Sequence, residues 1–277
     1  MNVNINEFFN LHPSEKEGII NQLKEEYRAN LTSEQREKLN TLIDWAVEFE
    51  QIPDQKPSNA IKALPKKDQI LPLLQKWLKN YIKSLNSPAS LRHAKPLSEK
   101  DTVEDPALAH MLSTHHKEIN KVIMNPAKVK QNLESHQILM AIENIQGHLL
   151  EDYIASVICQ PLYGFIWCDG QTIKAADFCK KTVVNNTPEL KLIQIKNKYN
   201  TENSSSSKIR EDTPIEIWHR LGKKKDSTGK NVPVYKWDEL NQIVEEMTQH
   251  NPNLNEKAYF DFLEEVIRKN PKIFFNG

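Results

Sequence analysis

Glycine and cysteine are scarce in this chain of 277 residues, which contains seven glycines and three cysteines. Only Gly18 precedes Gly147, so more than half of the chain lacks the residue most used in tight turns. The three cysteines, Cys159, Cys168 and Cys179, are odd in number and form no Cys-x-x-Cys pair. This pattern argues against a disulfide framework and against a zinc site, and it predicts buried thiols.

Long apolar runs and a net charge are also missing. No run approaches the roughly 20 residues that a membrane-spanning helix needs. The first residues lack the basic start and apolar stretch of a secretion signal, so we expect a cytoplasmic protein. The net charge is zero, but from Lys191 to Lys236 eleven lysines and arginines stand against five acidic residues. This segment predicts either a basic face that holds a phosphate backbone or a solvated, lysine-rich loop.

The glycine-poor half has the apolar spacing of α-helices, with hydrophobic residues three or four positions apart. The predicted helices begin near Ser14 and near Thr32 or Ser33, or cover about 68–85, 107–124 and 128–159. Three prolines and several serines over residues 86–106 predict a linker. We therefore expect a helical N-terminal region over residues 1–105 and a second domain over residues 106–277.

After Pro161 the pattern becomes that of strands. Strands are predicted at 163–167, 172–178 and 190–196, a hairpin or loop at 226–233, and helices at about 237–249 and 255–269. The first two strands are expected to pair around Asp169 and Gly170, a hairpin dipeptide. Together these elements predict an α/β fold, with a central mixed sheet flanked by helices.

Three residues suited to phosphodiester hydrolysis fall on these strands. Asp177 ends one strand, and Gln194 and Lys196 lie on the next, where alternation places both on one face. If the strands pair, a carboxylate, an amide oxygen and an ammonium meet. Asp177 and the Gln194 carbonyl would be oxygen ligands for Mg²⁺, and Lys196 would orient or deprotonate a water and balance transition-state charge.

A further carboxylate is expected, because only one of these three residues is anionic. The preceding predicted helix offers Glu143 and Glu151, eight positions apart and roughly on one face, with Gly147 between them. Glu151 is the first choice for the additional metal ligand and Glu143 the second. The alternative is that one or both are ordinary exposed helix residues.

Four stretches carry a resemblance to a known family. They are Glu-Asn-Ile-Gln-Gly-His-Leu-Leu-Glu-Asp-Tyr-Ile at 143–154, Trp-Cys-Asp-Gly at 167–170, Lys-Ala-Ala-Asp-Phe at 174–178, and Gln-Ile-Lys-Asn-Lys-Tyr-Asn-Thr-Glu-Asn followed by four serines at 194–207. With them, residues 136–221 resemble the SinI-like type II restriction endonucleases, which cut palindromes of the GGWCC or GGNCC kind. We name no resemblance for residues 1–105.

The resemblance implies a PD-(D/E)XK nuclease core, in which Asp177, Gln194 and Lys196 stand at the motif positions. It also implies a homodimer that cuts both strands of double-stranded DNA with Mg²⁺, leaving 5′-phosphates. A cognate DNA methyltransferase would belong to the same system without being a stable partner. Two residues depart from the superfamily pattern, since Ala176 replaces the proline and Gln194 replaces the acidic residue.

The residues after Lys196 are predicted to contact DNA. Asparagine amides pair with adenine or bridge to phosphates, serine hydroxyls bind phosphates, and arginine reads guanine through O6 and N7. The candidates are Lys198, Asn200, Asn203, Ser204, Ser205, Arg210 and Arg220. Arg210 and Arg220 are the predicted guanine readers. The four serines could instead form a flexible linker.

Two other functions remain open at this stage. One is a structure-selective nuclease such as a junction resolvase or repair enzyme, which would prefer branched DNA to a defined sequence. The other is a non-catalytic DNA-binding regulator that has kept the fold. Magnesium-dependent cleavage into defined fragments would distinguish a restriction endonuclease from both.

Overall fold

The computed structural model describes residues 2–88, 126–169, 175–198 and 214–271, together with residues 107, 110, 111, 113–115, 117, 172, 173 and 273. The chain forms two compact units. One comprises Met1–Pro88 and Glu151–Tyr259, and the other comprises Ala89–Leu150 and Phe260–Gly277. Among the described helices, none is both long and apolar enough to cross a lipid bilayer.

Five α-helices occupy the N-terminal part of the first unit. They are α1 (Ile5–Leu11), α2 (Pro13–Glu26), α3 (Ser33–Glu48), α4 (Asn59–Lys62) and α5 (Ile70–Asn86), with short 3₁₀ helices at Arg28–Asn30 and Lys67–Gln69. Helix α3 begins where predicted, because Thr32 and Gln35 form a capping box in which each side chain accepts from the other's backbone N–H. Helix α2 begins at Pro13, a residue whose fixed φ suits the first helical position.

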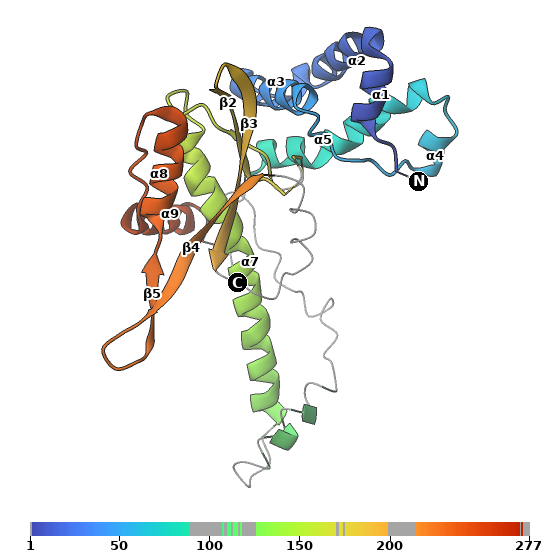
Figure 1. The fold of residues 1–277 in the computed structure, drawn as a ribbon. Coiled ribbons are helices and arrows are strands. Elements are labelled where there is room, and N and C mark those ends of the chain that lie inside the picture. Colours follow the sequence, from blue (N-terminus) through green and yellow to red (C-terminus); the bar gives the residue numbers. More distant parts are fainter. Residues whose placement is uncertain are drawn as a thin grey trace. The chain divides into compact units, whose positions relative to one another are not determined.

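The first unit also contains a five-stranded mixed sheet (Figure 1). Its strands are β1 (Ile166–Trp167), β2 (Phe178–Val184), β3 (Thr187–Lys198), β4 (Ile215–Lys225) and β5 (Asn231–Tyr235), in the order β1-β2-β3-β4-β5. Strands β3 and β4 run parallel, and every other neighbouring pair is antiparallel. The predicted mixed sheet flanked by helices is confirmed.

The strand boundaries differ from the prediction in several places. Residues 172 to 177 do not form the predicted strand in their described part, and β2 instead begins at Phe178. Strand β3 starts earlier than predicted, because Asn185 and Asn186 adopt positive φ and make a tight turn from β2. Strand β4 was not predicted, and it forms the parallel partner of β3.

One hydrophobic core joins the N-terminal helices to the sheet. Leu73 and Leu78 of α5 share it with Cys168, Cys179 and Leu192, and all five side chains are buried. The predicted burial of Cys168 and Cys179 is confirmed, while Cys159 is partly buried; all three are free thiols. The core therefore unites the N-terminal helices with the sheet, and the predicted domain boundary near residue 105 stays a prediction.

The two faces of β3 and β4 meet different surroundings (Figure 1). Leu192 belongs to the core of the N-terminal helices, and Ile193 and Ile195 point to the opposite face because side chains alternate along a strand. On that opposite face, Trp218 of β4 packs against Trp237 of helix α8 (Trp237–Thr248), with ring centroids 5.0 Å apart. Every residue of these strands can thus be assigned to one face or the other.

Two more helices follow the predicted pattern. Helix α7 covers Pro126–Ile158, close to the predicted 128–159, and helix α9 covers Glu256–Lys269. Tyr153 of α7 contacts Trp237 and Tyr259, with ring centroids 5.7 and 5.4 Å apart.

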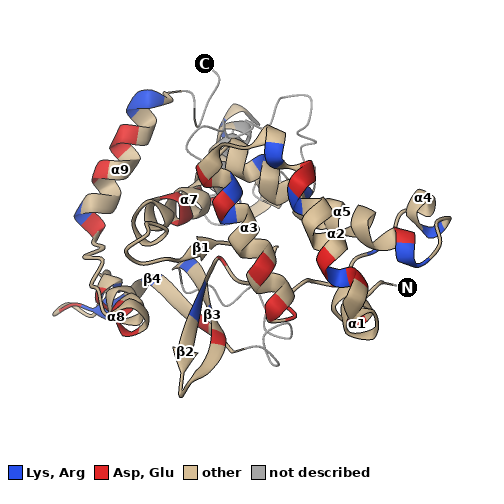
Figure 2. Ribbon diagram, turned by 90° about the horizontal axis from the view of Figure 1, so that it is seen from above, with Lys and Arg blue, Asp and Glu red and all other residues tan. Residues whose placement is uncertain are grey.

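Figure 2 shows residues of both charge signs along α9 and along the N-terminal helices. The predicted helix at 107–124 lies largely outside the described residues.

The second unit has a small core of its own. Ile145 and Leu149 of α7 are buried with Val266 of α9 and Ile273. Phe262 and Leu263 pack against this cluster. Residues 145 and 149, and 262 and 266, are four apart, so each helix contributes one apolar stripe.

Candidate active site

Asp177 lies directly before β2 and is held against β3 by two hydrogen bonds. Its backbone N–H donates to the Ile193 carbonyl at 2.9 Å, and its Oδ2 accepts from the Ile195 N–H at 2.7 Å. The side chain is buried, with 7% of its surface exposed. The predicted approach of Asp177 to the strand that carries Gln194 and Lys196 is therefore confirmed.

Gln194 and Lys196 lie on β3 beside this carboxylate. Alternation places both on the face that bears Leu192, opposite to Ile193 and Ile195. Gln194 is buried and Lys196 is partly exposed. The ammonium of Lys196 lies near enough to Asp177 to lower the pKa of that carboxyl. Asp177 and Lys196 therefore lie close together, and Gln194 lies on the same face of β3 as Lys196.

Glu151, at the start of the part of α7 that belongs to the first unit, adds a second carboxylate. It is partly buried, and its Oε2 accepts a hydrogen bond of 3.1 Å from Trp167 Nε1. Its pKa is raised, first by removal from water and second by the negative charge of Asp177. Glu151 and Asp177 therefore lie close enough for the charge of Asp177 to raise the pKa of Glu151, which is consistent with a shared metal site.

The positive charge beside the two buried carboxyls is too small to offset the cost of ionising both. The pKa of Asp177 is also raised, chiefly by burial, although the Ile195 N–H and the Lys196 ammonium both lower it. Raised pKa values mean that both groups hold protons more tightly than exposed carboxyls do. A cation placed between such groups would offset the cost of their ionisation, so the pair has the charge expected of a divalent-metal site.

The ligand set is small. Among the described residues, no three Asp, Glu, His or Cys side chains converge on one point as a metal-binding group. Two carboxylates and the Gln194 amide oxygen nevertheless fit Mg²⁺, which takes one or two carboxylates and completes its octahedron with water and substrate phosphate oxygens. These residues would therefore hold a Mg²⁺ ion whose remaining ligands are water and phosphate oxygens of the substrate.

Asp169 is a nearby acidic residue to which no site role was assigned from the sequence. Its backbone has φ of 55°, and its Oδ1 accepts from the Thr172 N–H at 2.9 Å and from Thr172 Oγ1 at 2.6 Å. Its charge contributes to the raised pKa of both Glu151 and Asp177. The sequence marked Asp169 only as a turn residue, and its place beside the site depends on the loop between β1 and β2.

Helix α5 of the N-terminal region supports the same loop. Tyr81 donates from its hydroxyl to the Trp167 carbonyl at 3.0 Å, and its ring stacks on the Trp167 ring with centroids 5.8 Å apart. Trp77 Nε1 donates to the Thr172 carbonyl at 2.8 Å. Because Trp167 in turn donates to Glu151, helix α5 contributes indirectly to the position of a candidate ligand. No sequence pattern linked residues so far apart.

Arg220 occupies a different environment from the one predicted. It is 4% exposed, its Nε donates to Asn197 Oδ1 at 2.9 Å, and its Nη1 pairs with Glu256. The guanidinium also lies over the Tyr259 ring, 5.2 Å from the centroid. Since His219 is opposite Lys196 in the register, Arg220 points to the other face of the sheet. This position is at odds with the predicted reading of guanine by Arg220.

The other predicted DNA contacts are only partly visible. Lys198 is the last residue of β3, opposite Leu221 in the register. Asn200, Asn203, Ser204, Ser205 and Arg210 lie outside the described residues. Glu143 is an exposed residue of α7 and belongs to the second unit. Their predicted roles remain predictions.

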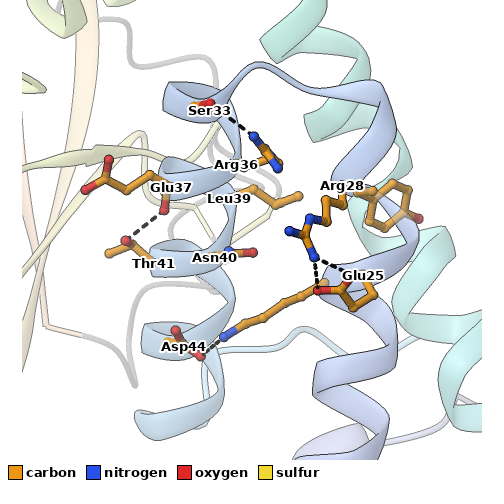
Figure 3. Close-up of a pocket in the computed structure, with 11 residues that line it drawn as sticks. Glu25, Arg28, Ser33, Arg36, Glu37, Leu39, Asn40, Thr41 and Asp44 are labelled. Carbon is orange, nitrogen blue, oxygen red and sulfur yellow. Dashed lines mark hydrogen bonds and ion pairs between the residues drawn. The ribbon is translucent and has the colours of Figure 1, made fainter.

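A pocket of about 530 Å³ lies between α2 and α3, away from these residues (Figure 3). Its lining includes Arg28 and Glu25, which form an ion pair at 3.2 Å, and Lys24 paired with Asp44. Arg36 donates to Ser33 Oγ at 3.0 Å. The paired charges leave no excess of either sign here, so this pocket lacks the features of the Asp177 site.

A mixed sheet with helices on both faces, and with carboxylates gathered beside a lysine on a central strand, defines an α/β enzyme of the restriction endonuclease kind. The model of the SinI restriction endonuclease family matches residues 72–269. Type II restriction enzyme SinI of Salmonella infantis is 34% identical over 236 residues, which are 79% of this chain and 94% of that enzyme. The chain therefore belongs to the SinI restriction endonuclease family, and the predicted resemblance is confirmed.

A second relative supports this assignment. Type II restriction enzyme Eco47I of Escherichia coli is 37% identical over 158 residues, which are 55% of this chain and 62% of that enzyme. Proteins that carry the name type II restriction enzyme are site-specific deoxyribonucleases. Because the match to the family model begins at residue 72, it includes most of helix α5 as well as the whole described sheet.

Proposed function

We propose that this protein is a type II restriction endonuclease that hydrolyses double-stranded DNA with Mg²⁺ at a short palindrome of the GGWCC or GGNCC kind. The observation that carries this proposal is the pair of carboxyls, Glu151 of α7 and Asp177 before β2, near Lys196 of β3. Membership of the SinI family supports the choice of DNA as substrate. A palindromic site also favours a homodimer, because two-fold symmetry in the protein matches two-fold symmetry in the DNA.

The proposed site divides its work among four side chains. Asp177, Glu151 and the Gln194 amide oxygen would hold Mg²⁺, with Asp177 fixed by the Ile195 N–H. Bound magnesium supplies positive charge to the phosphate and makes an attacking water more acidic. Lys196 orients that water and offsets the negative charge that develops on the phosphate oxygens. Attack at phosphorus with departure of the 3′ oxygen leaves a 5′-phosphate.

Digestion of a sequenced phage genome tests the whole proposal. Purified protein is incubated with this DNA in Mg²⁺ or in EDTA, and the ends of all fragments are sequenced. We expect defined fragments in Mg²⁺, ends that share one short palindrome, and no cleavage in EDTA. A uniform smear, or preference for branched over linear DNA, would instead identify a structure-selective nuclease. Binding without any cleavage would identify a regulator.

Recognition of the bases is proposed to rest on residues that follow β3. Arg210 is the remaining candidate reader of guanine, and Lys198, Asn200, Asn203, Ser204 and Ser205 are the candidate contacts to adenine or phosphate. Arg210→Ala should weaken specific binding by ~1–3 kcal/mol and leave the affinity for random DNA unchanged. Competition binding measures both quantities. Equal losses for specific and random DNA would make Arg210 a phosphate contact.

A further inference from the structure

The hairpin of β4 and β5 carries lysines for which the proposed catalytic site has no use. Lys223, Lys224 and Lys225 end β4, and Lys230 lies in the turn before β5. All four side chains are exposed, and they make no ion pair with the described residues. Four exposed cations on one hairpin produce a local positive potential, although the whole chain is neutral.

The register places two of these lysines on the same face as Lys196. Lys196 is opposite His219 in the parallel ladder, and alternation along β4 then assigns Lys223 and Lys225 to the face of His219. Lys224 points to the opposite face with Arg220 and Gly222. The catalytic face of the sheet therefore continues along β4 into a basic, exposed surface.

Strand β5 contributes to the same surface. Tyr235 and Pro233 are opposite Leu221 and Lys223, so they share the face of Lys223. Both are exposed, whereas Val232 and Val234, on the other face, are partly buried. We name the exposed face, formed by Lys223, Lys225, Pro233 and Tyr235, the hairpin face.

The turn holds this hairpin in a defined conformation. Asp226 Oδ1 accepts from the backbone N–H groups of Thr228 and Lys230 at 2.8 and 3.0 Å, and Gly229 has φ of 81°. The Asp226 N–H donates to the Lys230 carbonyl at 2.9 Å. Because the turn is stabilised by its own side chain and by a glycine at positive φ, the lysines are presented without support from neighbouring elements.

We propose that the hairpin face binds the sugar–phosphate backbone of DNA beside the phosphate that is cut. This inference rests on the proposed nuclease function and adds the element that binds the DNA flanking the cut. Lys223 and Lys225 are four and six residues beyond His219, which is about 13 and 20 Å along a strand. DNA rises about 3.4 Å per base pair, so these lysines reach phosphates about four to six base pairs from the cut.

The salt dependence of binding provides the test. Binding of the full chain to a fluorescent 30-base-pair random duplex is measured in EDTA over a series of salt concentrations, so that no cleavage occurs. The hairpin variant is Lys223→Gln with Lys225→Gln and Lys230→Gln. The matched control is Lys56→Gln with Lys62→Gln and Lys66→Gln, three exposed lysines near helix α4 with the same loss of charge.

We expect the negative slope of log K against log salt to become shallower by about two to three units in the hairpin variant, since each phosphate contact contributes about −0.9. The control should keep the slope of the unmodified protein. Equal falls in the two variants would show an effect of total charge and overturn the proposal, as would an unchanged slope in the hairpin variant. Thermal unfolding should be the same for all three proteins, because the replaced side chains are exposed.

Two single variants test the assignment of the face. Lys223→Gln should make the negative slope shallower by about 0.9, and Lys224→Gln, on the opposite face, should leave the slope unchanged. Equal falls would overturn the proposed face. Cleavage of phage DNA by the unmodified protein separates this proposal from the proposed function. Cleavage with no effect at the hairpin refutes the hairpin face alone, whereas absence of both binding and cleavage refutes both.

Discussion

Two clusters of charged side chains lie at strands β3 and β4, and they differ in how completely their charge is balanced. Arg220 is paired with Glu256, which also accepts from Trp237 Nε1 at 2.7 Å, and Arg220 further donates to Asn197. Each group there has a partner of suitable charge or polarity. The pKa values of Glu151 and Asp177, in contrast, are both raised, first by burial and, for Glu151, second by the negative charge of Asp177.

The difference separates a structural cluster from a functional one. Burying a charge is costly unless it is paired, so the Arg220–Glu256 pair satisfies the requirement of a folded interior. An unbalanced pair of carboxyls lowers stability and persists where binding or catalysis requires it. Charge balance therefore favours a structural role for Arg220, and it is consistent with the catalytic role proposed for Asp177.

The largest effect should come from removing the catalytic groups. Asp177→Ala and Lys196→Ala should each lower the cleavage rate by at least ~10³-fold and leave specific DNA binding largely intact, because both act on the metal and on transition-state charge. Single-turnover cleavage and binding in EDTA measure the two properties. Lys191→Ala is the matched control, since Lys191 lies on β3 but pairs with Glu189. Cleavage at the normal rate by either site variant would remove the assignment.

The balanced cluster should respond in stability. Arg220→Met should lower the free energy of unfolding by about 3–5 kcal/mol, because Glu256 is then left buried without its partner. Arg220→Met combined with Glu256→Gln should recover part of this loss, since glutamine still accepts from Trp237. Urea unfolding compares the two proteins. A single variant as stable as the unmodified protein would contradict a structural role for the pair.

The unbalanced cluster should respond in the opposite direction. Asp177→Asn should raise the free energy of unfolding in EDTA by about 1–2 kcal/mol, because it removes a desolvated charge and retains an acceptor for the Ile195 N–H. The gain should shrink in Mg²⁺, which would stabilise only the carboxylate form. Thermal unfolding in both conditions measures this. Asp226→Asn, at a turn carboxylate that accepts hydrogen bonds from Thr228 and Lys230, is the control and should give no gain in EDTA.

The smallest effect concerns the departure at Gln194. Gln194→Glu should remain active and need less Mg²⁺, by a factor of up to about ten, because a carboxylate is a stronger ligand than an amide for a hard cation. Titration of cleavage with Mg²⁺ checks this expectation, with the exposed residue change Gln160→Glu as control. Loss of cleavage with normal DNA binding would show that Gln194 has a role other than ligation.

The sequence predicted features that depend on local pattern. The helices α3, α5, α7, α8 and α9 are recognisable from apolar spacing, and α3 begins at Ser33, where a helix start was predicted. The spacing of Asp177, Gln194 and Lys196 predicted their approach because strand alternation is regular. Asparagine tolerates positive φ, so Asn185 and Asn186 are a turn signal in the sequence, although no turn was predicted there.

Other features depended on partners distant in the chain. The burial of Arg220 follows from Glu256, and no local pattern around Arg220 distinguishes a buried arginine from one that reads a base. Strand β4 ends in three lysines, and these hid its alternation of apolar and polar residues. The bonds from Trp77 and Tyr81 to the loop before Asp177 join segments of the chain that sequence reasoning treated as separate.

Those bonds from helix α5 set a lower limit on the length of an active fragment. Glu151, Asp177, Gln194 and Lys196 all lie beyond residue 150, which would suggest that a shortened protein could begin there. Tyr81 and Trp77 hold the Trp167 and Thr172 carbonyls, however, and the helix that carries them shares its core with the sheet. A minimised enzyme must therefore begin before α5 or receive that helix as a separate peptide.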